Sequence, residues 1–564
     1  MRTWGRLVAF VLTLSCALAS PGGAAEKADR IFVNGRLWTG EKTKPWAEAL
    51  AIRGTTILAV GSTAEIKRRA EKATDVVDLK GRFACPGFGD AHVGLMSGSL
   101  ALDQVDLAGA GTLDEVRARI SRYAKANPEA PWVVGRGWSY AAFPGGLPDK
   151  AVLDVLVSDR PAFLVSYDGH TGWANSPALI AAGITRSAKD PPGGAFVRDA
   201  GGEPTGALKE EAAMAPVRRL IPPPAPDQKA RALKKGLDLA AAQGLTAVHD
   251  LALNADDVEV FALVAGERPL KVTVFSALPL PREPTPEAMR GLAELRAKAR
   301  VSRWRIGAVM GFVDGVVESR TAAFFEPYPG GKELGLLGWA EEALDRAVAA
   351  IDKLGLQVAL HAVGDRAVHV ALNAVERAAR ANGTSGRRHR IEHLELVRPQ
   401  DLARFASLGV VASTQPPFAT PDRNHFEAYL PALGPERGAR ALAFKSIDDA
   451  GAAQAFGSNW PVCSLSVLRG IHAAVTRTTA EGTPAGGWEP SQRVSVEAAL
   501  RHYTRDVAFA SFEEGSRGTL AAGKQADLVV LSEDITAGPP ERLLAAKVLL
   551  TVLGGQDTYR AKEF

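Results

Sequence analysis

A histidine in a predicted strand is the first residue of this chain whose type and position could support catalysis. His92 lies in the segment 86–94, and two residues later, where a second histidine would complete a metal-binding pair, the chain has Gly94. Residues i and i+2 of a strand point to the same face, so a His-x-His pair there can hold one metal ion from one side. The pattern indicates a metal-binding strand that has lost one ligand.

Two more histidines follow predicted strands further along the chain. His361 comes after the apolar run 357–360, and His393 comes after the short strand 390–392. Each histidine taken singly is more often a hydrogen-bonded structural residue. Three imidazoles at the ends of separate strands, however, form a pattern that zinc sites use. The sequence therefore offers His92, His361 and His393 as candidate zinc ligands.

The elements that must position these histidines alternate regularly. Amphipathic stretches such as 230–243, 339–354 and 366–381 separate short runs rich in apolar and β-branched residues. This alternation is typical of a parallel α/β architecture. The number of units predicts a (β/α)8 TIM barrel, in which catalytic groups lie at the carboxyl ends of the strands.

Three segments depart from this alternation. Short strands with turn signals open and close the chain, so we expect residues 26–84 and 515–564 to form one composite β-sandwich domain beside a barrel of residues 85–514. Residues from about 100 to 224 are rich in glycine and proline and are predicted to form an insertion over the catalytic face. Such an insertion shapes a substrate pocket; a packing appendage is the alternative.

Composition and charge place the chain among ordinary globular proteins. Its 564 residues are 46% hydrophobic and 23% charged, and the formal net charge is +4. These values suit a large core with one barrel-sized domain and a smaller one. The sequence has no basic stripe interleaved with aromatic residues, so we expect no nucleic-acid partner. Composition and charge do not predict the oligomeric state.

The amino terminus has the layout of a secretory signal peptide. Two arginines precede the apolar run 7–12, and an Ala-Leu-Ala segment follows at 17–19. We therefore predict that residues 1–25 direct export to the periplasm or the exterior. The apolar run is shorter than the ~20 residues of a spanning helix, and no other segment is long enough to cross a membrane. A lipid anchor through Cys16 is the alternative.

After removal of that peptide, Cys85 and Cys463 are the remaining cysteines. Two cysteines so far apart make neither a disulfide scaffold nor a zinc knuckle, and we expect buried apolar side chains. A disulfide between them is the alternative, because distant parts of a barrel sequence close against each other.

Motifs along almost the whole chain resemble the amidohydrolase superfamily, in the branch that includes the N-substituted formamide deformylases. The matching segments are 34–35, 86–88, 168–170, 202–206, 314–315, 361–367, 390–393, 457–459 and 523–529. The resemblance implies a hydrolytic site with one or two metal ions, which acidify a water and polarise the scissile carbonyl while a carboxylate moves the proton. The implied ligands are a His-x-His pair, a carboxylated lysine, two further histidines and an aspartate, of which His92, His361 and His393 remain.

Three ligand positions of that pattern carry other residues here. The second histidine is Gly94, and the lysine position, four residues before Asp314, is Met310. The aspartate position is Asn459, whose neutral amide cannot act as a general base. Loss of a general base alone costs typically 10²–10⁴-fold in rate. We therefore predict that the usual binuclear mechanism does not operate.

The remaining histidines allow two interpretations of the cofactor. Three neutral imidazoles with an open fourth position can hold one zinc ion, provided that the three rings converge. In the arrangement that the resemblance implies, His92 faces a different part of the site from His361 and His393. A pocket without metal is therefore favoured over one zinc ion.

Further residues are candidates for substrate contact. Trp138, His170 and Trp173 belong to the predicted insertion, and His249 follows the strand 246–248. We predict that these four side chains line the substrate pocket, and that His170 donates a hydrogen bond to a substrate carbonyl or a developing oxyanion. A packing role is the alternative for each.

Three functions remain open from the sequence. The first is hydrolysis of a non-peptide C–N bond, such as an amide or formamide bond of a small molecule, by a reduced metal site. The second is a catalytically inactive barrel that binds a small molecule or a partner in the same pocket. The third is a metal-free lyase or isomerase built on His170 or His249. Fold analogy alone does not decide between them.

Overall fold

A computed structural model describes residues 26–167, 169, 171–191, 194–301, 303–383 and 385–564. The predicted signal peptide with Cys16 and the pocket candidate His170 lie outside the described residues. No helix of the described part is long and apolar enough to cross a membrane. Cys85 and Cys463 are both free thiols.

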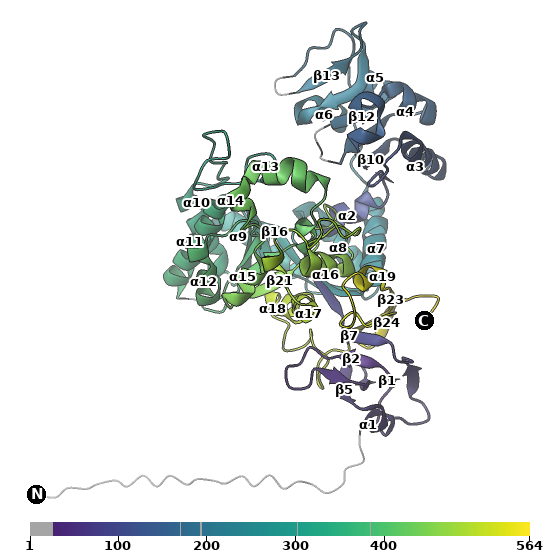
Figure 1. Ribbon diagram of the computed structural model, residues 1–564, viewed down its shortest axis with the longest axis vertical. Helices are drawn as coiled ribbons and strands as arrows, with labels where there is room; N and C mark the ends of the chain where they lie inside the picture. Colours follow the sequence, from purple (N-terminus) through teal and green to yellow (C-terminus); the bar gives the residue numbers. More distant parts are fainter. Residues whose placement is uncertain (1–25, 168, 170, 192–193, 302, 384) are drawn as a thin grey trace, which may run out of the picture.

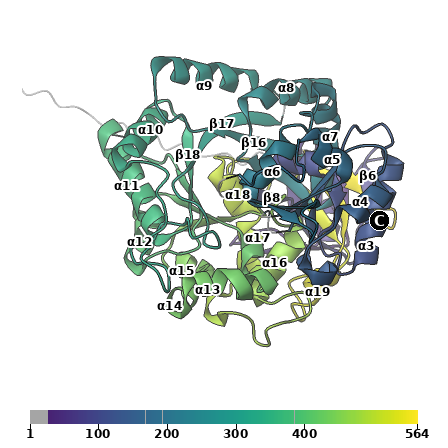
Figure 2. The ribbon, with the colours of Figure 1, turned by 90° about the horizontal axis from the view of Figure 1, so that it is seen from above.

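Within the described residues, eight parallel strands form a barrel at the centre of the molecule (Figure 1 and Figure 2). In spatial order they are β8 (Phe88–Val93), β15 (Leu245–Asp250), β16 (Thr273–Pro279), β17 (Trp304–Phe312), β18 (Gln357–Ala362), β19 (Arg390–His393), β20 (Val411–Thr414) and β21 (Ala453–Phe456). The backbone N–H of Asn459, just after β21, donates to the His92 carbonyl at 2.8 Å. The first and last strands thus meet, and the predicted TIM barrel is confirmed.

The helices that surround the barrel follow the amphipathic pattern of the sequence. They include α7 (Pro226–Ala242), α8 (Val258–Glu267), α9 (Pro286–Lys298), α10 (Glu341–Lys353), α11 (Asp365–Asn382), α12 (Pro399–Leu408), α15 (Phe444–Asp449), α16 (Val467–Thr476), α17 (Val496–His502) and α18 (Arg505–Ala510). In α11, Val368, Leu372 and Val375 recur at helical spacing and are buried. Gly383 ends that helix in the left-handed conformation that favours glycine. Every residue of β18 is buried, as expected for a strand covered on both faces.

The two ends of the chain together form a small domain of two sheets. One sheet has β5 (Thr56–Gly61), β4 (Ala49–Arg53), β1 (Arg30–Val33) and β6 (Asp75–Asp78); the other has β24 (Gln556–Arg560), β23 (Val548–Leu553), β22 (Leu528–Leu531), β7 (Phe83–Pro86), β2 (Arg36–Trp38) and β3 (Trp46–Ala47). The short helices are α1 (Thr63–Lys67) and α19 (Arg542–Ala545). Because β7 pairs with both β2 and β22, strands from the two chain ends share one sheet. We call this unit the composite domain.

An insertion follows β8 and α2 (Leu95–Ala101) and forms its own sheet and core. Its sheet has the order β13 (Ala195–Arg198), β14 (Pro204–Lys209), β12 (Thr171–Ala174), β11 (Ala162–Ser166), β10 (Val133–Trp138) and β9 (Val105–Asp106), with helices α3 (Leu113–Ala126), α4 (Lys150–Leu156), α5 (Ser176–Ala181) and α6 (Glu210–Arg218). Figure 1 shows the insertion at the end of the barrel opposite the composite domain. Chain segments after β20 add a π-helix (His425–Tyr429), α13 (Leu430–Leu433) and α14 (Pro435–Gly438) near this end.

Candidate functional site

Three imidazoles come together at the carboxyl ends of the barrel strands. His361 and His393 lie on the neighbouring strands β18 and β19, and their ring centroids are 4.4 Å apart. The ring of His92, from β8, has its centroid 4.9 Å from that of His393. His393 therefore lies between the other two rings. The expectation that His92 faces a different part of the site is wrong, because a contact across the barrel holds its ring beside His393.

That contact is made by Glu392, which lies one residue before His393 on β19. The Nδ1 atom of His92 is 2.8 Å from Oε2 of Glu392. The Nε of Arg390 donates to Oε1 of the same carboxylate at 2.8 Å, and both Arg390 and Glu392 are fully buried. Arg390 and Glu392 are two residues apart on one strand, so they share a face. The three residues form a buried chain that runs from Arg390 through Glu392 to His92.

Arg390 also fixes the residues beneath the imidazoles. Its Nη1 donates to Nδ1 of His249 at 2.7 Å, and its Nη2 donates to the carbonyl of Ala91 at 2.6 Å and to Oγ of Ser413 at 2.8 Å. Because Nδ1 of His249 accepts this bond, it offers no lone pair to a substrate proton. His249 is therefore buried within this network. The predicted contact between His249 and a substrate stays a prediction, which this position does not support.

The charge states of these groups follow from burial and pairing. Burial favours the neutral form of Glu392, but Arg390 and the bond from His92 outweigh it and lower the pKa of the carboxyl. Burial lowers the pKa of His361 to about 4 and that of His393 well below its ordinary value, with His361 adding repulsion to His393. At neutral pH the site therefore contains an ionised Glu392 and neutral rings at His361 and His393. Since an ionised carboxylate accepts, Nδ1 of His92 carries the hydrogen.

Asp314 fastens the loops after β17 and β18 to each other. Its Oδ2 accepts from the backbone N–H groups of Ala323 and Gly364 at 2.8 Å, and its Oδ1 accepts from that of Val363 at 2.9 Å. Burial raises the pKa of Asp314 to about 7 against the effect of these bonds. Nε2 of His361 donates to the carbonyl of Gly315 at 3.1 Å, which sets the orientation of that ring.

The residues at the three substituted ligand positions have structural roles in the barrel. Gly94 caps α2 and donates its N–H to the carbonyl of Trp460 at 2.7 Å. Met310 is buried in an apolar cluster with residues such as Leu251 and Phe275. Asn459 has a positive φ of 59°, which suits asparagine.

The donor set does not fit a metal ion. Within the described residues, no group of three or more His, Cys, Asp or Glu side chains is arranged to hold one. A zinc site needs convergent, available donors at about 2.0–2.1 Å. We therefore derive no catalytic step through a metal.

A cavity of about 560 Å³ lies beside Met310, at the ends of β15, β16 and β17. Its apolar wall includes Met96, Leu100, Leu251, Leu280, Phe312 and Trp339. Arg282 stacks over the ring of Trp339 at 4.5 Å, and Lys229 pairs with Asp257 at 2.5 Å. A mostly apolar cavity with a few polar groups is the usual form of a small-molecule site. We call it the mouth cavity.

The two tryptophans predicted to contact substrate lie in the core of the insertion. Trp138 and Trp173 are fully buried there. The Nε1 of Trp138 donates to the Leu164 carbonyl at 3.2 Å, and that of Trp173 donates to the Asp149 carbonyl at 3.1 Å. These bonds satisfy both indoles within the insertion, which gives them a packing role. Their part in binding stays a prediction that this placement does not support.

Glu392 and Arg390 are functional residues that the sequence reasoning missed. Their signal was present, because two oppositely charged residues at i and i+2 within a buried strand require internal partners.

Comparisons with known proteins agree with the barrel fold. The model of the Amidohydrolase family matches residues 75–559. Protein LONG AFTER FAR-RED 3 of Arabidopsis thaliana is 34% identical over 96% of this chain and 93% of its own length. The N-substituted formamide deformylase of Arthrobacter pascens is 28% identical over 94% of this chain and 98% of its own.

A solved structure extends the similarity to three dimensions. An uncharacterized metal-dependent hydrolase from Pyrococcus furiosus is 28% identical, with a TM-score of 0.71 over 90% of this chain and 100% of that one. The fold, the matched motifs and these relatives together show that the chain belongs to the amidohydrolase family.

Proposed function

We propose that this protein hydrolyses a non-peptide C–N bond, such as an amide or formamide bond of a small molecule, without the binuclear metal centre. Family membership and the similarity to a formamide deformylase support the bond type. The observation that carries the proposal is the buried chain from Arg390 through Glu392 to His92. A carboxylate that holds an imidazole by one nitrogen leaves the other nitrogen to act as a base.

His92 is the general base in this mechanism. Its Nδ1–H is held by Glu392, so the lone pair lies on Nε2, which has no hydrogen-bond partner among the described residues. About 9% of the side chain is exposed, and the mechanism requires a water molecule at Nε2. Nε2 takes a proton from that water as it attacks the carbonyl carbon, and then returns the proton to the leaving nitrogen. The Glu392 carboxylate stabilises the imidazolium formed between these steps.

Binding without turnover is the second candidate. No metal polarises the carbonyl in this mechanism, and the described cation nearest the base, Arg390, already bonds Glu392, His249 and Ser413. A site without an electrophile would bind the substrate of its relatives and leave it intact. The mouth cavity, whose lining residues do not include the three histidines, would hold the bound molecule in this second candidate.

The decisive experiment combines metal analysis with a panel of N-substituted formamides and small amides. We expect turnover that survives chelator treatment, and a 10²–10⁴-fold lower kcat in His92→Ala. Glu71→Gln, which alters an exposed carboxylate in the part of the chain that forms the composite domain, should retain full turnover. Turnover that disappears with chelator and returns with zinc would contradict the proposal. Thermal stabilisation by an amide without any turnover would favour the second candidate.

Export through residues 1–25 is also part of the proposal, and the charged and apolar pattern of that segment supports it. Amino-terminal sequencing of the protein recovered from each cell fraction tests it. We expect an exported form that begins after residue 25, and a full-length form held in the cytoplasm would contradict it.

A further inference from the structure

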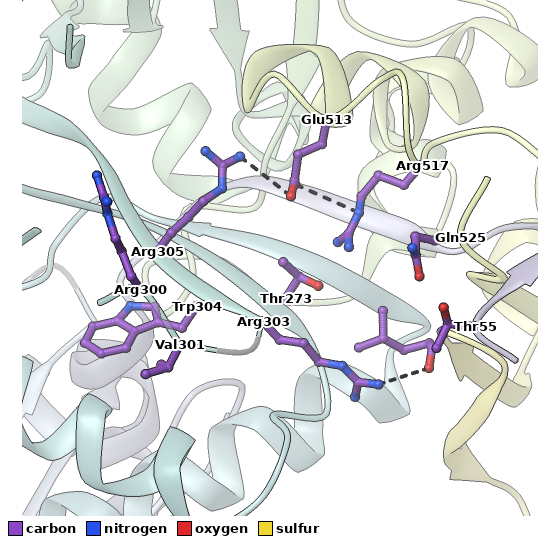
Figure 3. A pocket seen from close by; sticks show the side chains of 12 residues that line it. Thr55, Thr273, Arg300, Val301, Arg303, Trp304, Arg305, Glu513, Arg517 and Gln525 are labelled. Atoms are coloured by element: carbon purple, nitrogen blue, oxygen red, sulfur yellow. Dashed lines mark hydrogen bonds and ion pairs between the residues drawn. The ribbon is translucent and has the colours of Figure 1, made fainter. Parts of the chain in front are cut away.

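A second cavity lies at the opposite end of the barrel from the imidazoles (Figure 3). Its volume is about 540 Å³. Thr273 begins β16 and Arg303 directly precedes β17, so its barrel wall consists of the amino-terminal ends of strands. Thr55 and Gly554, from the composite domain, form the facing wall. We call this cavity the arginine pocket.

Cations outnumber anions on the wall of the arginine pocket. Arg300, Arg303, Arg305 and Arg517 line it, and Glu513 is the acidic residue among its lining residues. The Nη2 of Arg305 is 3.6 Å from Oε1 of Glu513, and the Nε of Arg517 is 3.9 Å from Oε2. Both distances exceed the 3.2 Å limit of a good N–H···O bond. Glu513 therefore offsets only part of the positive charge.

Several buried polar atoms around the pocket lack a partner. Nε and Nη1 of Arg517 and Oγ1 of Thr273 have none within the described part of the chain, and Thr273 is 6% exposed. Asp527 lies behind the wall, with Oδ2 at 3.7 Å from Nε of Arg517, too far for a hydrogen bond. A buried group without a partner costs free energy and calls for an explanation, such as a ligand.

The arginines also repel one another. Burial lowers the pKa of Arg303 and of Arg305; Asp527 raises the former and Glu513 the latter, and the charge of Arg517 lowers both. The guanidinium of Arg303 donates to a backbone carbonyl: its Nη1 is 2.7 Å from the carbonyl oxygen of Leu270. In Figure 3 these guanidinium groups approach the cavity from both of its sides. A bound anion would relieve this repulsion.

We propose that the arginine pocket binds an anion that carries a phosphoryl group. A phosphate dianion balances the excess charge, and its oxygens accept from guanidinium N–H groups two at a time. Thr273 Oγ1 adds a neutral donor to the same cavity. This site is independent of the function proposed for the imidazoles, because the two lie at opposite ends of the strands.

The volume of the arginine pocket indicates a ligand that is larger than a single inorganic ion. Cavities of 300–1,000 Å³ hold organic molecules of moderate size, and this one is about 540 Å³. Free phosphate, pyrophosphate and a phosphorylated small molecule share the recognised group. They differ in what fills the remaining space. A ligand there would touch both the barrel and the composite domain and stabilise their contact.

Calorimetry with phosphate, pyrophosphate, ATP and sulfate, at constant ionic strength on the full chain, tests the proposal. We expect binding of the phosphoryl anions, and an increase of about 2 °C in Tm when pyrophosphate exceeds its Kd a hundredfold. Arg303→Met should weaken pyrophosphate binding at least about tenfold, since it removes one positive charge from the wall of the pocket. Arg517→Met should abolish binding. Tighter binding of ATP than of pyrophosphate would assign the ligand as a nucleotide, and equal binding would assign the phosphoryl group alone.

Arg423→Met is the matched control, because it removes one exposed arginine and changes the net charge equally. It should bind pyrophosphate as the wild type does. If Arg517→Met fails to fold, Arg303→Met still decides the question. Equal affinity of wild type, Arg303→Met and Arg423→Met, or sulfate binding as tight as phosphate binding, would overturn the proposal.

Discussion

The two ends of the barrel treat buried arginine in opposite ways. At the mouth, Arg390 is fully buried and donates to Glu392, His249 and Ser413. At the amino-terminal end, Arg517 keeps two buried nitrogens without a partner in the described chain. The mouth thus neutralises its own charge, whereas the arginine pocket leaves charge unbalanced.

This difference shows where the molecule needs a ligand. At the mouth, internal contacts hold the residues at the candidate ligand positions: Glu392 holds His92, and Met310 packs against apolar neighbours. Such a site balances its own charge and, in the mechanism that we propose, supplies a base. An anion that enters the arginine pocket would stabilise it, because four arginines there face the carboxylates of Glu513 and Asp527 alone among the described residues. Family membership places the expected substrate at the mouth, whereas the excess positive charge places an expected anion at the other end of the barrel.

The largest effect is expected from Arg390→Met. This change leaves the Glu392 carboxylate buried without its cation, and breaking a buried pair costs about 3–5 kcal/mol. We therefore expect the free energy of unfolding to fall by about that amount in urea denaturation.

The double variant Arg390→Met, Glu392→Leu is the matched control. Replacing both partners by apolar side chains is often neutral, so it should recover most of the loss. A double variant as unstable as the single one would show that Arg390 stabilises the barrel through His249 and Ser413 rather than through Glu392.

The next effect is expected from restoring Gly94→His, Met310→Lys and Asn459→Asp together. A lysine in the apolar cluster around Met310 should lower stability by about 2–3 kcal/mol without metal. With zinc present, elemental analysis should show bound metal rising from less than about a tenth of an equivalent to nearly one.

The triple change has its own control in Met310→Leu, which keeps the cluster apolar and should bind no zinc. A Cβ at position 94 would lie 2.7 Å from Oγ of Ser97, which is a side chain able to rotate away. Failure of the triple variant to bind zinc would mean that the scaffold, and not only the ligands, has changed.

The sequence predicted much of the fold and part of the mouth. Apolar runs alternating with amphipathic stretches specify parallel strands, and the carboxyl ends of such strands meet. That logic brought His361 and His393 to one place, and their ring centroids are 4.4 Å apart. The same logic could not orient the ring of His92, because its orientation depends on Glu392 across the barrel.

Other features depend on contacts that spacing does not encode. Trp138 and Trp173 look alike in a sequence whether they line a pocket or fill a core, since aromatic residues serve both. The arginine pocket joins Arg303 to Arg517, which are distant in the chain and meet only because the composite domain closes against the barrel floor. Neither outcome follows from periodicity.

A smaller effect, on the pH dependence of stability, is expected from the buried ion pairs of His502. His502 bonds Asp448 at 3.0 Å and Asp506 at 2.9 Å, and although burial opposes it, these carboxylates raise the pKa of His502 above 6.5. A raised folded-state pKa gives stability that is complete below pH 6.5 and is lost as pH rises through the folded value. The Tm should therefore fall as the pH rises above about 6.5, and less steeply in His502→Gln. Parallel curves for the two proteins would refute this role.

The smallest effect is expected from Arg303→Met, and it separates the two ends of the barrel most directly. The change removes the bond to the Leu270 carbonyl, which is worth about 0.5–1.5 kcal/mol. It also removes the attraction of Asp527 and the repulsion of Arg517, which act in opposite directions. We therefore expect the free energy of unfolding without anion to change by less than about 1 kcal/mol, whereas Arg390→Met changes it severalfold more. A loss at Arg303 as large as that at Arg390 would mean that the arginine pocket already satisfies its own charge, and the contrast between the two ends would fail.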